Sequence, residues 1–457
     1  MSSTYLGKVN GVDISCDLDN VDMIKETLEE LQKLTGVEWD TFSETSGNWN
    51  LVFYRKDMFE VNTEYQEGYL HFKNLDFVEL PLNCSSCAYM FAECEMIEGF
   101  TLGEHFDTSA VIDMEGMFKY CAMSEGFTLG AYFNTSNVEN MADMFYRCAM
   151  SEGFTLGDHF DTSNVENMAS MFYRCIMSKV FSLGDHFDTS RTECMQRMFV
   201  QCNLPEDFTL GDKFDTSGVR MMSCMFEKCI LPEGFTLGDH FDTSNVTLMD
   251  CMFESCTLPN GFTLGDNFNT SKVKDMPNMF QDCELPEGFT LGDKFDTSNV
   301  VYMNAMFNSC KLPEGFTLGD YFDTSAVINM EGMFFNCKLP EGFTLGNHFV
   351  TSKVKNMSYM FSNCKLCESF TLGDYFDISS VMEMWDMFSG CKLPEGKTKK
   401  DFTSEVEIIE WLRGRSLDEF DVNEYLKDYI DILPVASKEA CKTKADCDAL
   451  LERLGLK

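Results

Sequence analysis

Met90-Phe91-Ala92-Glu93-Cys94 is the first of twelve Met-Phe-x-x-Cys segments, and Met387-Phe388-Ser389-Gly390-Cys391 is the last. Successive cysteines of this series lie 27 residues apart without a slip. A fixed period of this length indicates one supersecondary unit repeated in tandem. Units of this kind stack so that each contacts only its neighbours along the array. The period therefore predicts a solenoid of twelve 27-residue coils.

A representative coil runs from Phe235 to Gly261. Phe-Thr-Leu at its start is long enough for one short strand, which the following Gly ends. The later pattern Val-x-x-Met-x-x-Met-Phe-x-x-Cys places apolar residues every three to four positions, as on one face of a short helix. Asn140 and its equivalents are suitable N-caps for that helix. Each coil is thus predicted to hold one strand and one short helix, which makes the fold class an α/β solenoid.

The ends of the chain do not follow the period. Residues 1–73 predict a small α+β module that caps the first coil, with a helix that Asp19-Asn20 can cap and that Gly36 ends. Short strands are expected in three segments of this module: residues 48–55, 58–65 and 68–72. Residues 74–397 hold the twelve coils. Residues 398–457 predict a helical C-terminal cap, with helices expected at residues 404–413, 417–430 and 438–454.

The chain is strongly acidic, with 35 Lys and Arg against 75 Asp and Glu, a net charge of -40. Hydrophobic residues make up an ordinary 44% of the 457 residues, so the chain can form a core. This charge disfavours nucleic acid and membrane surfaces as direct partners and favours another protein with a basic surface. The sequence starting at Met1 shows no signal-peptide pattern, which predicts a cytoplasmic protein with free thiols.

The segment FDTSNVENMASMF from Phe160 to Phe172, with Cys175 behind it, resembles the repeats of bacterial surface proteins and lipoproteins related to leucine-rich repeats. The resemblance covers about residues 74–397. It implies a leucine-rich-repeat-like stack of strand-plus-helix units. It also implies a non-enzymatic binding protein, in many cases one that lies at the cell surface.

The Met, Phe and Cys positions persist from coil to coil and are expected to form internal columns. Met and Cys are also the ligand types that bind copper(I). No coil is singled out as a metal site, however, and the neighbouring Phe residues indicate dry packing. The columns are therefore assigned to the core, and no metal and no cofactor are expected. The sequence also contains no nucleophile–base pair and no nucleotide-binding motif, so no catalytic residues and no enzyme activity are expected.

Aspartate recurs at two positions of the coil. The first aspartate column comprises Asp158, Asp185, Asp212, Asp239, Asp293 and Asp320, and the second comprises Asp161, Asp188, Asp215, Asp242, Asp296 and Asp323. The second column is suited to capping turns through backbone amides. Alternatively, at a coil spacing of roughly 4.8 Å, the two columns approach the charge density of nucleic acid. Calcium bridging is a weaker alternative, because the Gly-rich nonapeptide pattern of calcium-binding solenoids is missing.

The early coils differ from the later ones at positions that vary. Tyr, Lys and Arg gather there, and both Tyr and Arg are enriched at binding hot spots. The candidate partner-binding ridge comprises Lys119, Tyr120, Tyr146, Arg147, Tyr173, Arg174, Arg191 and Arg197. The alternative interpretation is a solvated ridge whose positive charges offset the acidity nearby.

These features favour a non-enzymatic solenoid that binds another protein through its acidic, coil-variable surface. The second hypothesis is an acidic mimic of nucleic acid that blocks the groove of a nuclease or another defence enzyme. The third is a surface adhesin, which would need an export leader upstream of Met1.

Overall fold

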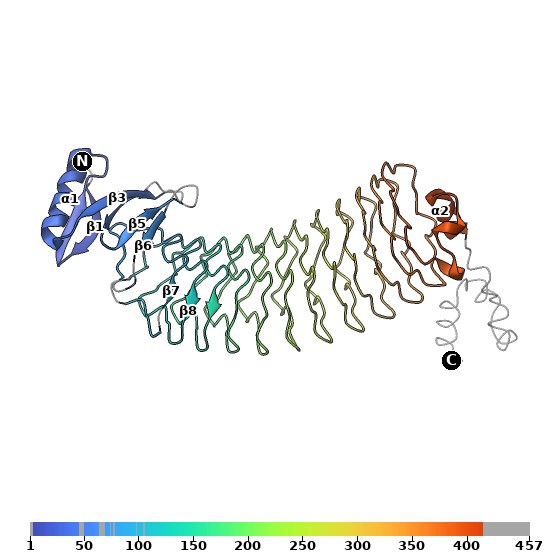
Figure 1. Ribbon diagram of the computed structural model, residues 1–457, viewed down its shortest axis with the longest axis horizontal. Coiled ribbons are helices and arrows are strands. Elements are labelled where there is room, and N and C mark those ends of the chain that lie inside the picture. Colours follow the sequence, from blue (N-terminus) through green and yellow to red (C-terminus); the bar gives the residue numbers. More distant parts are fainter. Residues whose placement is uncertain are drawn as a thin grey trace.

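The computed structural model describes residues 3–44, 50–63, 69–73, 75, 78–96, 98–103 and 106–414. Figure 1 shows a mixed module at the N-terminal end, followed by a long row of similar chain turns that lie side by side. The strands of the N-terminal module are β1 (Thr4–Val9), β2 (Val12–Cys16), β3 (Trp39–Glu44), β4 (Asn50–Arg55), β5 (Phe59–Asn62) and β6 (Tyr69–Phe72). They pair antiparallel as β1–β2, β3–β4 and β5–β6.

The helix of this module, α1 (Val21–Thr35), has the two ends that the sequence predicts. The side chain of Asn20 accepts hydrogen bonds from the backbone N–H groups of Asp22 and Met23, and Gly36 ends the helix at φ +75°. The β1–β2 hairpin was not expected from the sequence. Its turn is Asn10-Gly11, with positive φ at both residues, a pair typical of two-residue hairpins.

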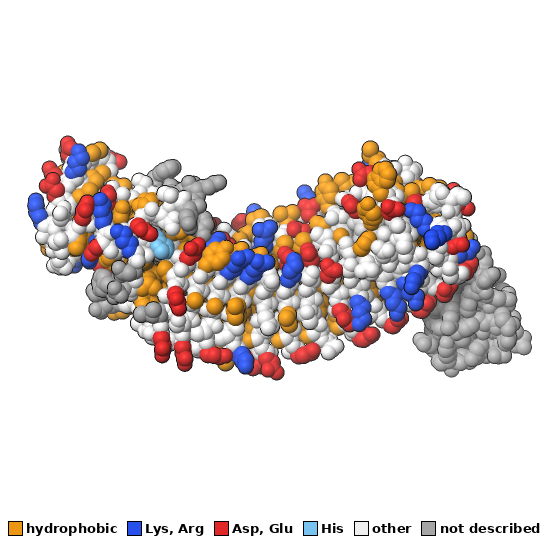
Figure 2. All heavy atoms as spheres, in the orientation of Figure 1, with side chains coloured by type: hydrophobic (Ala, Val, Ile, Leu, Met, Phe, Trp, Pro, Cys, Tyr) orange, Lys and Arg blue, Asp and Glu red, His pale blue; other side chains and the backbone are white. Residues whose placement is uncertain are grey.

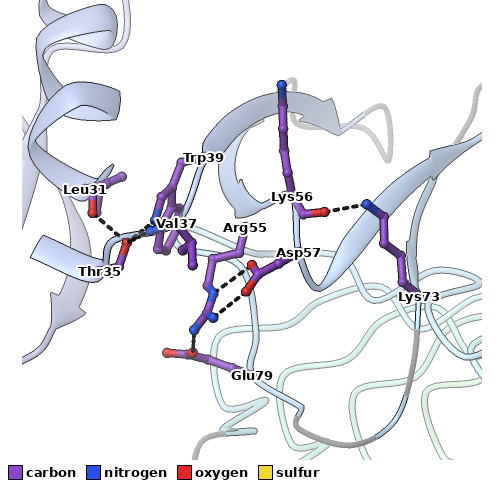
Figure 3. A network of polar contacts seen from close by, with 9 residues as sticks. All are labelled: Leu31, Thr35, Val37, Trp39, Arg55, Lys56, Asp57, Lys73 and Glu79. Carbon is purple, nitrogen blue, oxygen red and sulfur yellow. Dashed lines mark hydrogen bonds and ion pairs between the residues drawn. The ribbon is translucent and has the colours of Figure 1, made fainter. Parts of the chain in front are cut away.

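Polar contacts hold the segments of this module together (Figure 3). The Arg55 guanidinium donates two hydrogen bonds to the Asp57 carboxylate, at 2.7 and 3.1 Å, and lies 3.8 Å from Glu79. The Arg55 guanidinium lowers the pKa of the Asp57 carboxyl. The module then joins the repeats through its last strand, because the Phe72 ring stacks on Phe91 of the first Met-Phe-x-x-Cys segment at 4.8 Å.

The inward positions of the repeats form continuous columns of side chains. In one repeat, Val246, Met249, Met252 and Phe253 are fully buried, and Cys256 is nearly so. The Phe rings of successive Met-Phe segments stack at centroid distances of 5.4–5.8 Å from Phe91 to Phe388. One hydrophobic core therefore runs from the N-terminal module to residue 412.

The segment expected to be a short helix is a run of tight turns instead. The N–H groups of Met225 and Cys229 donate to the carbonyl oxygens three residues earlier, those of Met222 and Phe226. Alternate N–H groups of this segment donate to the next repeat instead: Cys224 to Asp250 at 2.8 Å and Phe226 to Met252 at 3.0 Å. The helix prediction is wrong here because Cys224 and Lys228 have positive φ, which an α-helix does not allow. The turns also bury apolar residues every three to four positions, so the same sequence pattern fits both structures.

Parallel pairing between repeats occurs away from the predicted strand. Bridges join residues 27 apart just before the first Met, as in Asn140–Asn167, and just after the Cys, as in Ile230–Thr257. The second position forms the short strands β7 (Glu95–Met96), β8 (Ala122–Met123) and β9 (Ala149–Met150). Among the described Phe-Thr-Leu segments, only Thr101–Thr128 forms a bridge.

In most of the described repeats, two polar side chains satisfy backbone carbonyl groups inside the stack. The hydroxyl of fully buried Thr216 donates to the carbonyl oxygen of Asp242 in the next repeat at 2.8 Å. The thiol of Cys229 donates to the carbonyl oxygen of Phe199 in the preceding repeat at 2.7 Å. Because an unpaired buried carbonyl is costly, these side chains stabilise the contact between repeats.

The C-terminal side of the stack is covered by two short 3₁₀ helices, η1 (Pro394–Gly396) and η2 (Lys399–Asp401), and by α2 (Glu405–Gly414). Ile408, Ile409 and Leu412 of α2 are buried in the common core. The helix predicted at residues 404–413 is therefore present, shifted by one residue. The helices predicted at 417–430 and 438–454 lie outside the described residues.

Candidate functional site

Two positions of each repeat, between the Phe and the Cys of Met-Phe-x-x-Cys, carry the variable side chains. Lys119, Tyr146 and Tyr173 occupy the first position in three successive repeats. The second position holds Tyr120, Arg147 and Arg174 in the same repeats, each with φ between +55 and +62°. Because the N–H of every second residue bonds to the neighbouring repeat, both positions are held in register.

These six residues form one contact group, which we call the Tyr/Arg surface. The rings of Tyr146 and Tyr173 are parallel, with centroids 4.5 Å apart and an interplanar angle of 1°. Tyr120 meets Tyr146 edge-on at 5.5 Å. The Arg147 guanidinium lies 5.6 Å from the Tyr120 ring, and the Arg174 guanidinium lies 5.4 Å from the Tyr173 ring. Such pairs add attraction to the area that they bury.

Lys119 fixes the N-terminal end of this surface. Its ammonium lies 4.5 Å from the Tyr146 ring centre and 2.6 Å from the carboxylate of Asp143. Only 12% of the Lys119 side chain is exposed, so this ion pair is largely shielded from water. Burial, together with the neighbouring Tyr173, raises the pKa of Tyr146, and the phenol therefore stays neutral. Tyr120, Arg147 and Arg174 remain exposed.

The contact group extends further toward the N-terminus than the sequence indicated. Lys119 also lies 5.7 Å from the ring of Tyr89, which donates a hydrogen bond to Glu115 and packs against Tyr69 at 5.3 Å. Tyr89 occupies the repeat position of Gly116 and Asp143, not that of Lys119 and Tyr146, so the period does not connect it with the other Tyr residues. Tyr69 lies before the repeats, so the period gave no signal for it.

The remaining two residues of the candidate partner-binding ridge lie elsewhere. Arg191 belongs to another position of the repeat, where it donates to Asn164 at 2.6 Å and pairs with Glu166 at 3.5 Å. Arg197 is exposed at the position equivalent to Asp143, three residues before the position of the Tyr side chains. Figure 2 shows Lys and Arg side chains gathered beside hydrophobic ones over the N-terminal half of the repeats.

The two aspartate columns have different environments. In the second column each carboxylate accepts a hydrogen bond from the backbone N–H of the Ser two residues later, at 2.7–3.0 Å, and each residue is half-buried. These are the turn-forming bonds that Asp-x-Ser makes possible. The six residues of the first column are exposed. The second column therefore has a structural role, whereas the first is free to face solvent or a partner.

The hollows near these surfaces are shallow. One of about 400 Å³ lies next to the Tyr/Arg surface and is lined by Arg174, Cys175, Ile176, Met177, Gln201 and Asn203. Ile176 is 70% exposed there and adds an apolar contact beside Arg174. A second, of about 450 Å³, includes Phe335 and Tyr359 in the later repeats. The sequence comparison between repeats did not identify the second hollow.

The thiols of the Met-Phe-x-x-Cys column are not suited to binding a metal without rearrangement. Burial raises the pKa of Cys148, Cys202 and Cys337 to about 12, so they stay protonated. Their S–H groups donate to backbone carbonyl oxygens. In the part of the chain that the structure describes, one group brings metal-ligand atoms together: Cys224, Asp250 and Cys251.

In the described part of the chain, neither α1 nor α2 combines the length and the apolar character needed to cross a bilayer. The geometry as a whole defines a tandem-repeat protein whose units associate through backbone bonds and present variable side chains between Phe and Cys. A family model matches residues 85–210, 195–311 and 288–402, which together make up more than half of the chain. The chain thus belongs to the family described as Mycoplasma protein of unknown function, DUF285. No curated protein and no solved structure matched this chain. The family match confirms the resemblance to a bacterial repeat family, and the relation to leucine-rich repeats stays a prediction.

Proposed function

We propose that this chain is a non-enzymatic, protein-binding solenoid and that the Tyr/Arg surface is its main contact site. One observation carries the proposal: three repeats in a row place Tyr and Arg side chains in a single stacked group that is open to solvent. The same positions hold Glu254-Ser255 and Asn308-Ser309 in later repeats. Stacking of the repeats does not need Tyr or Arg there, and their presence favours a binding role.

The surface is held in place before any partner arrives. Tyr146 is fixed between Lys119 and Tyr173, so little side-chain freedom is left to lose on binding. Immobilising a flexible side chain at an interface costs roughly 0.5–1.5 kcal/mol, and a preorganised surface avoids much of this cost. The guanidinium groups of Arg147 and Arg174 are suited to donate hydrogen bonds to a carboxylate or a carbonyl oxygen.

The expected partner follows from the charges. Carboxylate or carbonyl groups of the partner would meet Arg147 and Arg174, and an apolar side chain would fit beside exposed Ile176. The net charge of -40 favours a partner whose remaining surface is basic. This combination describes a folded protein surface of mixed charge, and neither nucleic acid nor a lipid surface has it.

Pull-downs from the native host with two variants of the chain test the proposal. Changing Tyr146, Arg147, Tyr173 and Arg174 to Ala should abolish capture of the partner, since the central hot-spot side chains are removed. The matched control changes Asn308 and Ser309, the equivalents of Tyr146 and Arg147, and should capture the partner normally. Equal capture by both variants, each with a wild-type circular dichroism spectrum, would refute the proposed site.

Nucleic-acid mimicry is the second candidate, and it depends on the exposed first aspartate column. The Phe rings next to the second column stack at 6.3–6.5 Å per repeat, a wider spacing than 4.8 Å. The first aspartate column contributes one exposed carboxylate per repeat, so at the spacing of these rings it supplies a charge every 6.3–6.5 Å, compared with one per roughly 1.7 Å in duplex DNA. A mimic would release its partner steeply with added salt and would compete with DNA. Salt-resistant capture without competition would exclude it.

The two aspartate columns can be separated experimentally. Asp215→Ala removes the acceptor for the Ser217 N–H and should lower stability by about 1 kcal/mol, whereas exposed Asp212→Ala should stay within about 0.5 kcal/mol of wild type. Under mimicry, Asp212→Ala should weaken partner capture. The surface-adhesin hypothesis and the cytoplasmic location are separate proposals, which immunolocalisation of the protein in its host would distinguish.

A further inference from the structure

Cys224 and Cys251 occupy a repeat position at which packing of the fold does not require cysteine. Both lie two residues before the Phe of the Met-Phe-x-x-Cys segment, in neighbouring repeats, and both have positive φ, at +58 and +55°. Other described repeats place Gly, Asp, Ser, Arg, Asn, Ala or Tyr at this position. Neither residue belongs to the Met-Phe-x-x-Cys column. Two successive cysteines here therefore need an explanation other than stacking of the repeats.

The structure brings a carboxylate to the same place. The Sγ atoms of Cys224 and Cys251 and a carboxylate oxygen of Asp250 all lie within 4.8 Å of one another. The N–H of Cys224 donates to the carbonyl oxygen of Asp250 at 2.8 Å, which keeps the two repeats in register. Ser223 donates its hydroxyl to the Asp250 carboxylate and so orients it. The amide of Asn278 points at the Cys251 sulfur, with its nitrogen 3.6 Å away.

We propose that Cys224, Asp250 and Cys251 form a binding site for a thiophilic divalent cation of the Zn²⁺ type. Thiolate ligands select Zn²⁺ and related ions over Mg²⁺ and Ca²⁺, which prefer oxygen. Zn–S bonds are about 2.3 Å long, so two ligand atoms on one ion lie less than roughly 4.6 Å apart. The spacing of the three atoms therefore needs little adjustment. Solvent completes the fourth position.

Binding exchanges protons for the ion. Two S–H groups are deprotonated, the two sulfurs bond to the cation, and two protons leave to solvent without any change in oxidation state. Affinity should therefore increase with pH. Lys228 lies nearby but is engaged by the carboxylates of Glu227 and Glu254.

The site would join two repeats in the middle of the stack. Cys224 belongs to one repeat, while Asp250 and Cys251 belong to the next, so a bound cation cross-links them. It would also lie on the same face as the Tyr/Arg surface, because Glu227 and Glu254 occupy the positions equivalent to Tyr146 and Tyr173. The inference does not depend on the protein-binding proposal. A cation here would stiffen the stack even if that surface bound nothing.

Titration of the reduced, chelator-treated full chain with Co²⁺ tests the site. Co²⁺ is a spectroscopic substitute for Zn²⁺, and thiolate ligation produces a near-ultraviolet charge-transfer band. The wild type should bind one equivalent more than the Cys224→Ser/Cys251→Ser variant. Asp250→Asn should weaken binding, and Ser223→Ala should weaken it roughly tenfold through loss of the orienting hydrogen bond. The matched control is Cys194→Ser, which also lies outside the Met-Phe-x-x-Cys column and should leave the titration unchanged.

Each other outcome has a definite meaning. The same stoichiometry in the wild type and the double variant would overturn the site, and so would binding that ignores Asp250→Asn. After exposure to metal and air, the wild type could retain no metal and have a mass lower by two hydrogens, while the mass of the double variant is unchanged. This result would show a Cys224–Cys251 disulfide in place of the metal site. If Asp250→Asn unfolds at the same temperature as the wild type, a loss of binding in this variant does not come from misfolding.

Discussion

The buried thiols of the Met-Phe-x-x-Cys column make stability depend on pH in the alkaline range. Burial raises the pKa of Cys148, Cys202, Cys283, Cys337 and Cys391 to about 12. In the unfolded chain a thiol titrates near pH 8.5. Between these two values the folded protein holds protons that the unfolded chain has lost. The contribution of these thiols to the free energy of unfolding should therefore be fully present below about pH 8.5 and should decrease as the pH rises toward 12.

The size of the effect follows from the two pKa values. Each thiol should lose about 1.4 kcal/mol of its stabilising contribution per pH unit, or about 3 kcal/mol at pH 10.5. The five thiols with a pKa of about 12 would together lose roughly 14 kcal/mol, as much as the whole stability of an ordinary domain. The repeats should thus unfold cooperatively between about pH 10 and 11.

A serine variant isolates one thiol from every other group that titrates. Cys148 donates its S–H to the Phe118 carbonyl oxygen at 2.8 Å, and a serine hydroxyl can replace that bond but does not titrate in this range. At pH 8, Cys148→Ser should be less stable than wild type. At pH 10.5 the difference should shift by about 3 kcal/mol in favour of the variant.

Urea unfolding of both proteins at several pH values, followed by circular dichroism under reducing conditions, measures this difference. Lysine and tyrosine titrate equally in the two proteins, so their effects cancel. A gap between wild type and variant that stays constant within about 0.5 kcal/mol from pH 8 to 10.5 would refute the reasoning. The Cys148 thiol would then ionise as easily in the folded stack as in the unfolded chain.

Two further predictions concern bonds and backbone angles within the repeats. Thr216→Val removes the hydroxyl that donates to the buried Asp242 carbonyl, so thermal unfolding should show a loss of stability of about 1–3 kcal/mol. The control, exposed Thr209→Val, should stay within about 0.5 kcal/mol of the wild type. Equal effects of the two substitutions would mean that the hydroxyl bond contributes nothing to stability. Ala305 and Gly332 share one repeat position, at φ +55 and +58°. Ala305→Gly should therefore stabilise the protein by about 0.5–1 kcal/mol in urea unfolding, and Gly332→Ala should destabilise it by a similar amount. Opposite signs would contradict the left-handed backbone geometry.

The sequence predicted the inward columns because their period is strict and their residues are apolar. It also predicted α1, because Asp19-Asn20 and Gly36 are residue types that start and end helices, and Asn20 is the N-cap in the structure. The run of turns in place of the short helix was not predictable from apolar spacing, which fits both. The deciding feature is positive φ at two positions per repeat, and residues such as Asp143 and Arg147 give no sign of it. Only the backbone bonds to the next repeat select the turns.

The candidate site was predictable only where the period was used. Tyr146 and Tyr173 are 27 residues apart, and they stack. Arg191 was included because it is near them in sequence, yet its register places it beside Asn164. Cys224 and Cys251 are also 27 residues apart and outside the main cysteine column, so the same comparison would have found them. The repeat position of a residue determines which side chains lie next to it in the stack. It therefore predicts contacts better than closeness along the chain does.

The number of free positions explains why both candidate sites lie on one face. Met, Phe and Cys positions fill the core, while Thr162 and Asp161 are used for a carbonyl and a turn. Few positions remain that face solvent and are also held by backbone bonds to both neighbouring repeats. The two residues between Phe and Cys meet this condition as a pair, because the first accepts a bond from the preceding repeat and the second donates one to the next. Cys224, three residues before the first of them, donates its N–H to the next repeat. A side chain placed there meets its equivalent in the next repeat at a fixed distance, which suits stacked rings and paired ligands alike.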